Sequence, residues 1–432
     1  MTSKNKTKLD YYWDKLFDKY DILDEISKNG FFEITSTQIN EFREARLMTK
    51  FDHRSNLPVL FKDNDLSILP ITRGNYIISN FEAYHDFEPA NKTIHKITYP
   101  TYIESIDFGN ITSESLVINT AYLTGMIADF TEEEGLLPTI NGRMGSESFD
   151  FQIYNKTFNK LQTISIDKSQ LEIDGGYENV NSLTLLEAKN SISDDFIVRQ
   201  LYYPYRLFKD KVTKPIKPIY LTYSNGIFYF YEYMFEDSGN YNSLVLVKQK
   251  NYTLESEDIS FDELVAICHQ IQLTSEPYGV PFPQANSFNR VVNICELLFE
   301  NETLTRDEIT LNYDFDVRQT HYYTDACRYL GLVEKQKDHF EGVRYYLTDK
   351  GKALFSLNIK KRNLQFARYI LEKRVFNEAF KMYIKHSELP SKEDIVKIMK
   401  NAKLYNVRSD STFFRRSSTV LGWLKWIIDL VN

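Results

Sequence analysis

Apolar residues recur at helical spacing near the start of the chain and at strand-like spacing soon afterwards. Residues 9–27 and 35–48 predict two amphipathic helices, the second opened by a Ser or Thr cap. Residues 56–79 change to short apolar runs separated by Asn, Asp, Pro and Gly, which predict short strands and turns. We therefore expect an N-terminal α/β accessory domain over residues 1–130.

The middle of the chain follows the order strand, strand, helix, strand. A helix is expected from about residue 115 to 129. Beyond it, apolar runs predict strands at 149–154, 171–174, 183–189, 216–224 and within 226–236, with a helix at 194–210. The glycine pair after Asp174 is interpreted as the turn that returns the chain from residues 171–174 to 183–189. This order predicts an α+β block over residues 131–280.

The pattern becomes helical again from Ser287 onward. Helices are predicted at 287–301, 304–314 and 317–334, and two strand-like runs within 332–348 flank the segment KDHFEG. Thr305 and Glu308 have the spacing of a capping box. Three short helices followed by a two-stranded turn predict a winged helix over residues 285–357, with the third helix in the major groove.

The last block, residues 358–432, repeats this helical pattern more weakly. It contains a long expected helix from 360 to 386, a second one opened by Ser391, and a final one that carries Arg415 and Arg416. Trp423 and Trp426 share the final helix with several leucines and isoleucines, so we expect them in the core. The block is predicted to be a basic, second winged-helix-like domain.

Composition fits this α+β multidomain organisation. With 432 residues, of which 42% are apolar, the chain can fill about three globular cores. No run approaches the roughly 20 apolar residues that cross a bilayer, and the N-terminus lacks an apolar signal core. We therefore expect a soluble, cytoplasmic protein. Cys268, Cys295 and Cys327 are widely spaced, which favours structural thiols over a disulfide or a zinc site.

Three residues in LEIDGGYENVNSLTLLEAKN carry candidate chemistry. Side chains alternate along a strand, so Glu187 and Lys189 lie on one side of the run LTLLEAK and Ala188 on the other. If residues 171–174 form the neighbouring strand, Asp174 lies beside that pair. Two carboxylates and one amine can hold a divalent metal, orient a water and stabilise charge on a phosphate. The alternative is that these are ordinary solvated charges at a strand end.

Charge is distributed unevenly, although the net charge is −8. Residues 131–200 carry 12 acidic and 6 basic side chains, whereas residues 358–432 carry 16 basic and 7 acidic ones. Metal chemistry is therefore expected in an acidic block and phosphate contact in a basic one, unless the basic block is only a solvated surface. Five basic residues in the N-terminal domain offer a third DNA contact: Arg43, Arg46, Lys50, Arg54 and Arg73.

The candidate DNA-binding residues lie on three predicted helices. On the third helix of the winged-helix block, Arg318, His321, Asp325 and Arg328 form the polar side, and Tyr322, Ala326, Tyr329 and Leu330 the inward stripe. Arg318 and Gln319, near its start, suit contacts with base edges, although winged helices also bind proteins. Arg415 and Arg416 open the final helix.

Arg199 and Gln200 are placed on the helix that follows Lys189, about three turns from the metal site. They suit contact with a phosphate backbone, and the competing interpretation is an interior hydrogen bond that holds the helix to the sheet. Glu147, near the strand at 149–154, is an additional candidate acid, with a surface carboxylate as the alternative.

Residues 140–225 resemble the PD-(D/E)xK nuclease superfamily, and the whole arrangement resembles a type II restriction endonuclease with C-terminal helix-turn-helix modules. DVRQTHYYTDACRYLGLVE and RRSSTVLGWLKWI resemble the DNA-reading parts of such enzymes. One departure is Ile173, which stands where the signature has Pro; members of the superfamily often lack that Pro.

The resemblance implies a mixed-sheet nuclease core that hydrolyses double-stranded DNA with Mg²⁺. It implies Asp174 and Glu187 as metal ligands, helped by the carbonyl of Ala188, and Lys189 as the residue that assists the attacking water or stabilises the transition state. Many such enzymes are homodimers, but the oligomeric state stays open here, because cutting both strands needs either two active sites or two sequential events. The resemblance also implies a methyltransferase encoded nearby that is not a stable subunit. Three alternatives stay open: a non-catalytic DNA-binding regulator, a phage-defence or repair nuclease acting on modified or branched DNA, and an aromatic-rich protein-interaction module.

Overall fold

A mixed seven-stranded sheet forms the centre of the fold in the computed structural model, which describes residues 6–254, 258–338, 342–402 and 404–431. The chain is an α+β protein, as expected. The strand order is β5 (Ile94–Ile97), β14 (Leu244–Leu254), β13 (Ile227–Phe235), β12 (Ile216–Ser224), β10 (Leu183–Lys189), β9 (Gln170–Glu178) and β6 (Leu137–Gly145). β10 runs parallel to β12, and β14 to β5, whereas the other neighbours are antiparallel.

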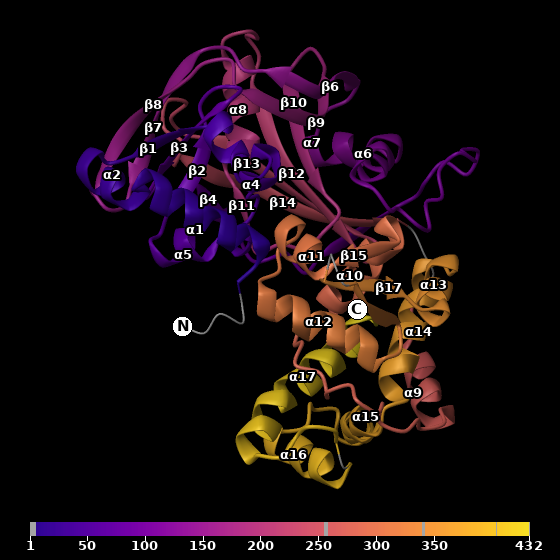
Figure 1. The fold of residues 1–432 in the computed structure, drawn as a ribbon. Helices are drawn as coiled ribbons and strands as arrows, with labels where there is room; N and C mark the ends of the chain where they lie inside the picture. Colours follow the sequence, from indigo (N-terminus) through magenta and orange to yellow (C-terminus); the bar gives the residue numbers. More distant parts are fainter. Residues whose placement is uncertain (1–5, 255–257, 339–341, 403, 432) are drawn as a thin grey trace.

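Helices cover both faces of this sheet (Figure 1). The crossover helix α8 (Arg199–Lys209) joins the parallel strands β10 and β12 and packs on one face, as the order strand, helix, strand predicts. The other face packs on α6 (Glu114–Leu123) and α7 (Met126–Thr131). The single helix expected from 115 to 129 is divided in two because Gly125 adopts a left-handed conformation with φ +78°.

The glycine pair after Asp174 is not the expected turn. Gly175 and Gly176 lie inside β9, and the chain turns later, between Asn179 and Ser182. A Cβ added to Gly176 would lie 2.7 Å from the Cβ of Ile140 on β6. Glycine is therefore needed here for close approach between neighbouring strands, and not for a reversal of the chain.

The N-terminal elements share a core with the α8 face of the sheet. They are α1 (Lys8–Tyr20), α2 (Ile22–Asn29), β1 (Phe32–Thr35), α3 (Ser36–Asn40), α4 (Ala45–Met48), the 3-10 turn η2 (Arg54–Asn56), α5 (Val59–Asp63), β2 (Ser67–Pro70), β3 (Asn75–Ser79) and β4 (Tyr84–Asp86). β1, β3 and β2 form a small sheet, and β4 pairs with β11 (Asp195–Ile197). The hairpin of β7 (Phe149–Asn155) and β8 (Lys160–Ile166) joins the same core, so the core does not divide at residue 130 as expected.

The expected helix at 35–48 is two short helices, α3 and α4, and its cap is Thr35. The Thr35 hydroxyl accepts from the Gln38 N–H, and the Gln38 side chain accepts from the Thr35 N–H, which completes a capping box. The predicted cap is confirmed. The helix expected at 9–27 likewise divides into α1 and α2, because Asp21 between them adopts a left-handed conformation.

The C-terminal half begins with α9 (Phe261–Gln270) and continues in the order helix, strand, helix, helix, strand, strand. These elements are α10 (Phe288–Asn301), β15 (Thr303–Thr305), α11 (Arg306–Asn312), α12 (Val317–Tyr329), β16 (Val333–Asp338) and β17 (Gly342–Leu347), followed by α13 (Asp349–Ala353) and η3 (Leu354–Ser356). The sheet order is β15-β17-β16. The capping box of Thr305 and Glu308 is confirmed. Residues 339–341 of the predicted segment KDHFEG lie outside the described residues.

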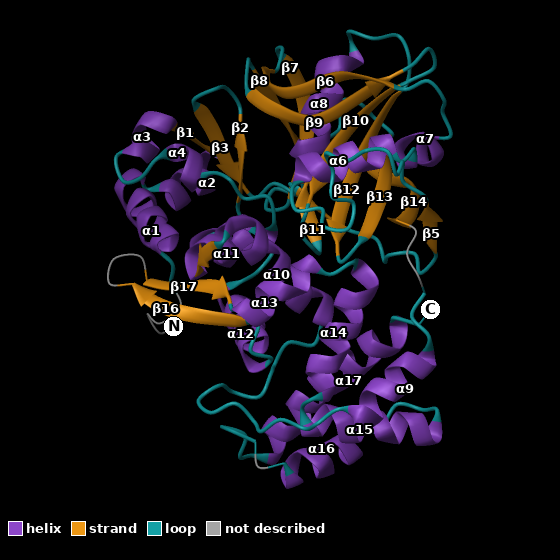
Figure 2. Ribbon diagram, turned by 90° about the vertical axis from the view of Figure 1, so that its right-hand side faces the viewer, coloured by secondary structure: helices purple, strands orange, loops and turns teal. Residues whose placement is uncertain are grey.

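The last block contains four helices and no strand within residues 358–402 and 404–431: α14 (Ile359–Leu371), α15 (Arg374–His386), α16 (Lys392–Asn401) and α17 (Asp410–Asp429). The expected second wing is therefore not found in that part of the chain, and the long helix expected at 360–386 breaks at Lys373. One hydrophobic core extends from α9 to α17, across the expected boundary between residues 357 and 358. The helices α9, α14, α15, α16 and α17 lie together in the lower part of Figure 2. Trp423 and Trp426 are buried in it, as predicted.

The three cysteines are free and buried, as expected. The closest pair, Cys295 and Cys327, has its sulfur atoms 3.9 Å apart in the C-terminal core. Among the described residues, no helix combines the length and apolar character needed to cross a membrane.

Candidate active site

Strands β9 and β10 bring Asp174 close to Glu187. Their register ends with Gly175 opposite Leu186, and Asp174 and Glu187 are the residues next to this last pair on the two strands. Asp174 Oδ2 accepts a hydrogen bond of 2.9 Å from the backbone N–H of Ala188. That bond fixes the carboxylate at the end of β10.

Lys189 completes the group that the sequence predicted. Its Nζ donates to Glu187 Oε1 at 2.6 Å and to the carbonyl of Ala188 at 3.1 Å. The Glu187 and Lys189 side chains are nearly enclosed, with 9% and 15% of their surface exposed. The structure therefore brings Asp174, Glu187 and Lys189 together at one strand end.

Gln200 lies in direct contact with this group. Its Nε2 donates to Glu187 Oε1 at 2.7 Å, so the expected separation of three turns is wrong. The reason is that α8 begins at Arg199, and its first turn, not its last, faces β10. Gln200 thus makes the interior hydrogen bond between helix and sheet that was the competing interpretation. Arg199 turns inward too, because its Nε is buried without a hydrogen-bond partner and its charge lowers the pKa of Asp52.

Two further carboxylates surround Lys189 and were not predicted. Glu114, the first residue of α6, has Oε1 3.9 Å from Lys189 Nζ. Asp52 comes from the N-terminal domain; burial would raise its pKa, but the ammonium groups of Lys189 and Lys50 outweigh burial and lower it. Neither acid has a sequence signal, because only the tertiary fold brings residues 52 and 114 to β10.

Burial dominates the protonation of the site. It raises the pKa of Glu187 to about 8; the charge of Asp174 acts in the same direction, and the Lys189 ammonium opposes both. Burial alone would lower the Lys189 pKa, but the carboxylates of Glu187 and Glu114 hold that pKa well above its usual range. Lys189 is therefore a permanent cation, whereas Glu187 can exchange a proton near neutral pH.

The donor set suits a magnesium ion that keeps some of its water. Within the described ranges, no three His, Cys, Asp or Glu side chains gather as a metal site. Mg²⁺ in proteins commonly takes one or two carboxylates and completes its shell with waters and substrate phosphates. Asp174, Glu187 and the carbonyl of Ala188 match that pattern, and both hydrogen bonds to Glu187 go to Oε1, which leaves Oε2 for a ligand.

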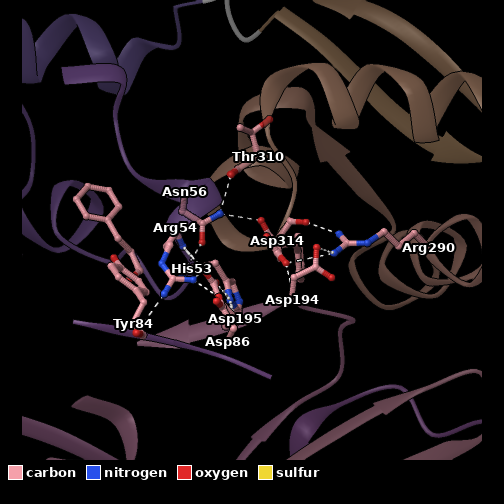
Figure 3. Close-up of polar contacts among 12 residues, drawn as sticks. His53, Arg54, Asn56, Tyr84, Asp86, Asp194, Asp195, Arg290, Thr310 and Asp314 are labelled. Atoms are coloured by element: carbon pink, nitrogen blue, oxygen red, sulfur yellow. Dashed lines mark hydrogen bonds and ion pairs between the residues drawn. The ribbon is translucent and has the colours of Figure 1, made fainter. Parts of the chain in front are cut away.

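The loop that follows Lys189 is held by the C-terminal half (Figure 3). Asn293 on α10 accepts from the Ile192 N–H and donates to the carbonyl of Asn190, both at 3.3 Å. Asp314 accepts from the Asp194 N–H at 2.7 Å, and Arg290 pairs with both carboxylates. The end of β10 is thus tied to α10 by several polar contacts.

The N-terminal domain also takes part in this contact region between the loop after Lys189 and the C-terminal half, which we call the junction. Asn56 donates to the carbonyls of Thr310 and Tyr313, and Arg54 pairs with Asp195 and Asp86. The candidate site therefore lies where all three parts of the chain meet.

Glu147 does not join the site. Its side chain is 68% exposed and pairs with Lys211, which follows the far end of α8. An 11-residue helix is about 16 Å long, and Gln200 at the other end marks the site. Glu147 is therefore a surface carboxylate, which was the alternative interpretation.

The predicted polar side of α12 is exposed in part. Arg318 is exposed, and its guanidinium donates to the Tyr322 hydroxyl at 3.2 Å. Gln319 accepts from the Asp316 N–H as part of a helix cap, so its side chain already has a structural role. His321 is exposed, and Arg328 pairs with Asp325 at 2.6 Å.

One member of the inward stripe on α12 was misplaced. Ala326, Tyr329 and Leu330 are buried as predicted. Tyr323 is buried in place of Tyr322, which is only partly buried. Tyr323 packs against Phe315, with ring centroids 5.5 Å apart.

Arg415 and Arg416 lie beside this helix. Burial and the neighbouring Arg415 lower the pKa of Arg416, and the charges of Tyr322 and Asp325 on α12 oppose that effect. Residues at the start of α17 and the polar side of α12 are thus close in space.

Three family models match successive parts of this chain. All three are described as domains of unknown function: DUF6996 matches residues 10–78, DUF6997 matches 79–253 and DUF7226 matches 290–432. No curated protein and no solved structure matches the chain significantly. Asp174, Glu187, Lys189, Gln200 and Glu114 all fall in the second match, whereas Asp52 falls in the first.

Proposed function

We propose that this protein is a Mg²⁺-dependent endodeoxyribonuclease of the PD-(D/E)xK superfamily, acting as a type II restriction endonuclease. The observation that carries the proposal is the proximity of Asp174, Glu187 and Lys189: Asp174 accepts from the Ala188 N–H between the other two, and Lys189 donates to Glu187. These residues lie on a mixed sheet in which a crossover helix joins parallel strands. The substrate is double-stranded DNA.

Each residue has a role in the hydrolysis of a phosphodiester bond. Asp174, Glu187 and the carbonyl of Ala188 would hold the magnesium ion, which supplies Lewis-acid stabilisation of charge on the phosphate. Lys189 orients the attacking water or stabilises the developing negative charge. Gln200 fixes the Glu187 carboxylate through its hydrogen bond to Oε1. Asp52 and Glu114 help to keep Lys189 protonated.

The C-terminal half would bring the DNA to this site. The order α10, β15, α11, α12, β16, β17 supports a winged helix, in which α12 would read the major groove. Arg318 and His321 are the exposed candidates for base contact, and Arg415 at the start of α17 is the exposed candidate for phosphate contact. Because α12 and the start of α17 are neighbours, one DNA duplex can engage both.

Incubation of the purified protein with plasmid and phage DNA tests the proposal. We expect discrete fragments in the presence of Mg²⁺ and none with EDTA, because the carboxylates hold the ion that hydrolysis requires. Sequencing the fragment ends would then give the recognition site and the stagger. Failure to cut any of a wide set of DNA substrates, including methylated and branched ones, would rule out the nuclease and favour the non-catalytic regulator.

Magnesium binding is expected to depend on pH. Because the pKa of Glu187 is about 8 without metal, binding below that pH must displace one proton. The Mg²⁺ concentration for half-maximal binding should therefore fall by about tenfold for each unit that the pH rises toward 8, and then level off. Calorimetric titration in several buffers would measure both the slope and the released proton. A pH-independent affinity between 6 and 8 would contradict this assignment, and Glu172→Gln, an exposed change on β9, is the control.

A further inference from the structure

A cavity of about 360 Å³ lies on the same face of the sheet as the candidate site. The strand register places Lys189 beside Thr222 and Thr222 beside Tyr229, so these residues form one row across β10, β12 and β13. Thr222 and Tyr229 line the cavity. Because neighbouring strands are about 4.8 Å apart, Tyr229 is roughly 10 Å from Lys189.

Aromatic rings form one wall of this cavity. Phe87, Tyr229 and Tyr231 all line it, and the rings of Phe87 and Tyr231 are in contact, with centroids 4.9 Å apart. Because these two rings are tilted by 46° to each other, one of them can stack on a flat ligand while the other meets its edge. The volume falls within the range of sites that enclose small organic ligands.

The remaining lining is polar, and two of its hydroxyl groups are available to a ligand. Ser193 Oγ is buried without a hydrogen-bond partner in the structure. Ser287, the N-cap of α10, makes no side-chain cap bond, so its hydroxyl can bind a ligand. The carboxylates of Glu88 and Asp194 disfavour a phosphate, and both already have partners: His85 and Tyr233 for Glu88, and Arg290 for Asp194.

We propose that this cavity binds the flat ring of a nucleobase. Stacking on the aromatic wall would hold the ring, and the hydroxyl groups of Ser193 and Ser287 would bond its polar edge. Enzymes that act on DNA can extrude a base from the duplex into a pocket that stacks on it and reads its edge. Resting on the proposed function, the inference assigns the ring to a base extruded close to the cut phosphate.

Free nucleosides test the ring site on the full-length protein. Saturation-transfer NMR with adenosine, cytidine, guanosine and thymidine should show binding of at least one of them. Tyr229→Ala should weaken that binding by roughly tenfold, because one stacking surface is lost. Ala90→Trp, which places an indole at the exposed mouth of the cavity, should also remove it. Tyr278→Ala, at a tyrosine with 97% exposure, is the control and should bind as the parent does.

A second experiment tests whether the bound ring is a base extruded from the DNA duplex or a free nucleoside. Permanganate and chloroacetaldehyde modify unpaired bases, and they can be applied to plasmid DNA bound to the Lys189→Ala variant. We expect new reactive bases in that complex, and fewer when Ala90→Trp is added. If a nucleoside binds but the duplex stays paired, the ring site stands and the extruded base is excluded in favour of a free nucleoside.

Failure of this inference is distinguishable from failure of the proposed function. If no nucleoside binds and no base becomes reactive, or if Ala90→Trp and Tyr229→Ala bind as the parent does, the cavity is not a base site even when DNA is cut. If DNA is never cut but nucleoside binding is lost in Ala90→Trp, the base site stands without a nuclease. Lys189→Ala should bind nucleosides normally, because Lys189 does not line the cavity.

Discussion

Replacing Lys189 with alanine is expected to slow Mg²⁺-dependent DNA cutting by about a thousandfold while DNA binding is retained. The reason is that Lys189 is the cation held closest to the predicted metal ligands, 2.6 Å from Glu187 Oε1. Removal of one group that stabilises transition-state charge commonly costs about 100- to 1000-fold in rate, and a lost proton-transfer role costs a comparable factor. Single-turnover cutting of plasmid DNA measures the effect. Asp174→Ala should be at least as severe, because it removes a metal ligand.

The matched control is Glu172→Ala on the same strand. Glu172 lies two residues before Asp174 and carries the same charge, but its side chain is 56% exposed and pairs with Arg143 at the surface. Its replacement should leave cutting and thermal stability close to those of the parent. A Lys189→Ala or Asp174→Ala protein that is folded, binds DNA and cuts at the parent rate would place the active site elsewhere. Loss of cutting in Glu172→Ala would show that the effect is not specific to the predicted residues.

The part of this site that lies on one strand could be predicted from the sequence. Alternation along LTLLEAK fixes Glu187 and Lys189 on one face whatever the rest of the fold does, because side-chain direction in a strand has a period of two residues. Asp174 was correctly placed beside them even though the turn was misread, because β9 is antiparallel to β10 in either case. The capping boxes at Thr35 and Thr305 were predictable for the same local reason.

The contributions from other parts of the chain could not be predicted. Glu114, Asp52 and Gln200 reach the site only through the packing of α6, the N-terminal domain and α8, and nothing in their local sequence indicates this. The shared cores could not be predicted either, because a change of hydrophobic period marks a new element and not a new core. The buried face of α12 was displaced by one residue because neighbouring tyrosines, Tyr322 and Tyr323, fit a helical stripe almost equally well.

The other large effect is expected at the junction, where Asp314→Ala should lower the free energy of unfolding by about 3–5 kcal/mol. Asp314 is 5% exposed, pairs with the equally buried Arg290 and accepts from the Asp194 N–H. Burial would raise the Asp314 pKa, but Arg290 and His53 outweigh burial and lower it, so the carboxylate is charged at neutral pH. Removing Asp314 leaves the buried Arg290 guanidinium with only the exposed carboxylate of Asp194 as an ionic partner, and breaking a buried pair carries a cost of this size.

Asp194→Ala is the matched control, because Asp194 also pairs with Arg290 but its side chain is 81% exposed. That change should cost at most about 1 kcal/mol, since exposed ion pairs contribute little. Urea unfolding at constant pH would measure both variants. If the two lose equal stability, the buried carboxylate does not hold the junction together.

The same comparison tests whether the junction positions the catalytic lysine. Asp314→Ala releases the Asp194 N–H, which is five residues beyond Lys189, at the end of the loop that α10 also holds through Asn293. Misplacement of a catalytic group by about 1 Å can cost up to about 100-fold in rate, so cutting should fall more than DNA binding does. Asp194→Ala keeps its backbone N–H and should cut nearly as the parent does. Equal cutting by the two variants at a temperature where both are folded would restrict Asp314 to stability alone.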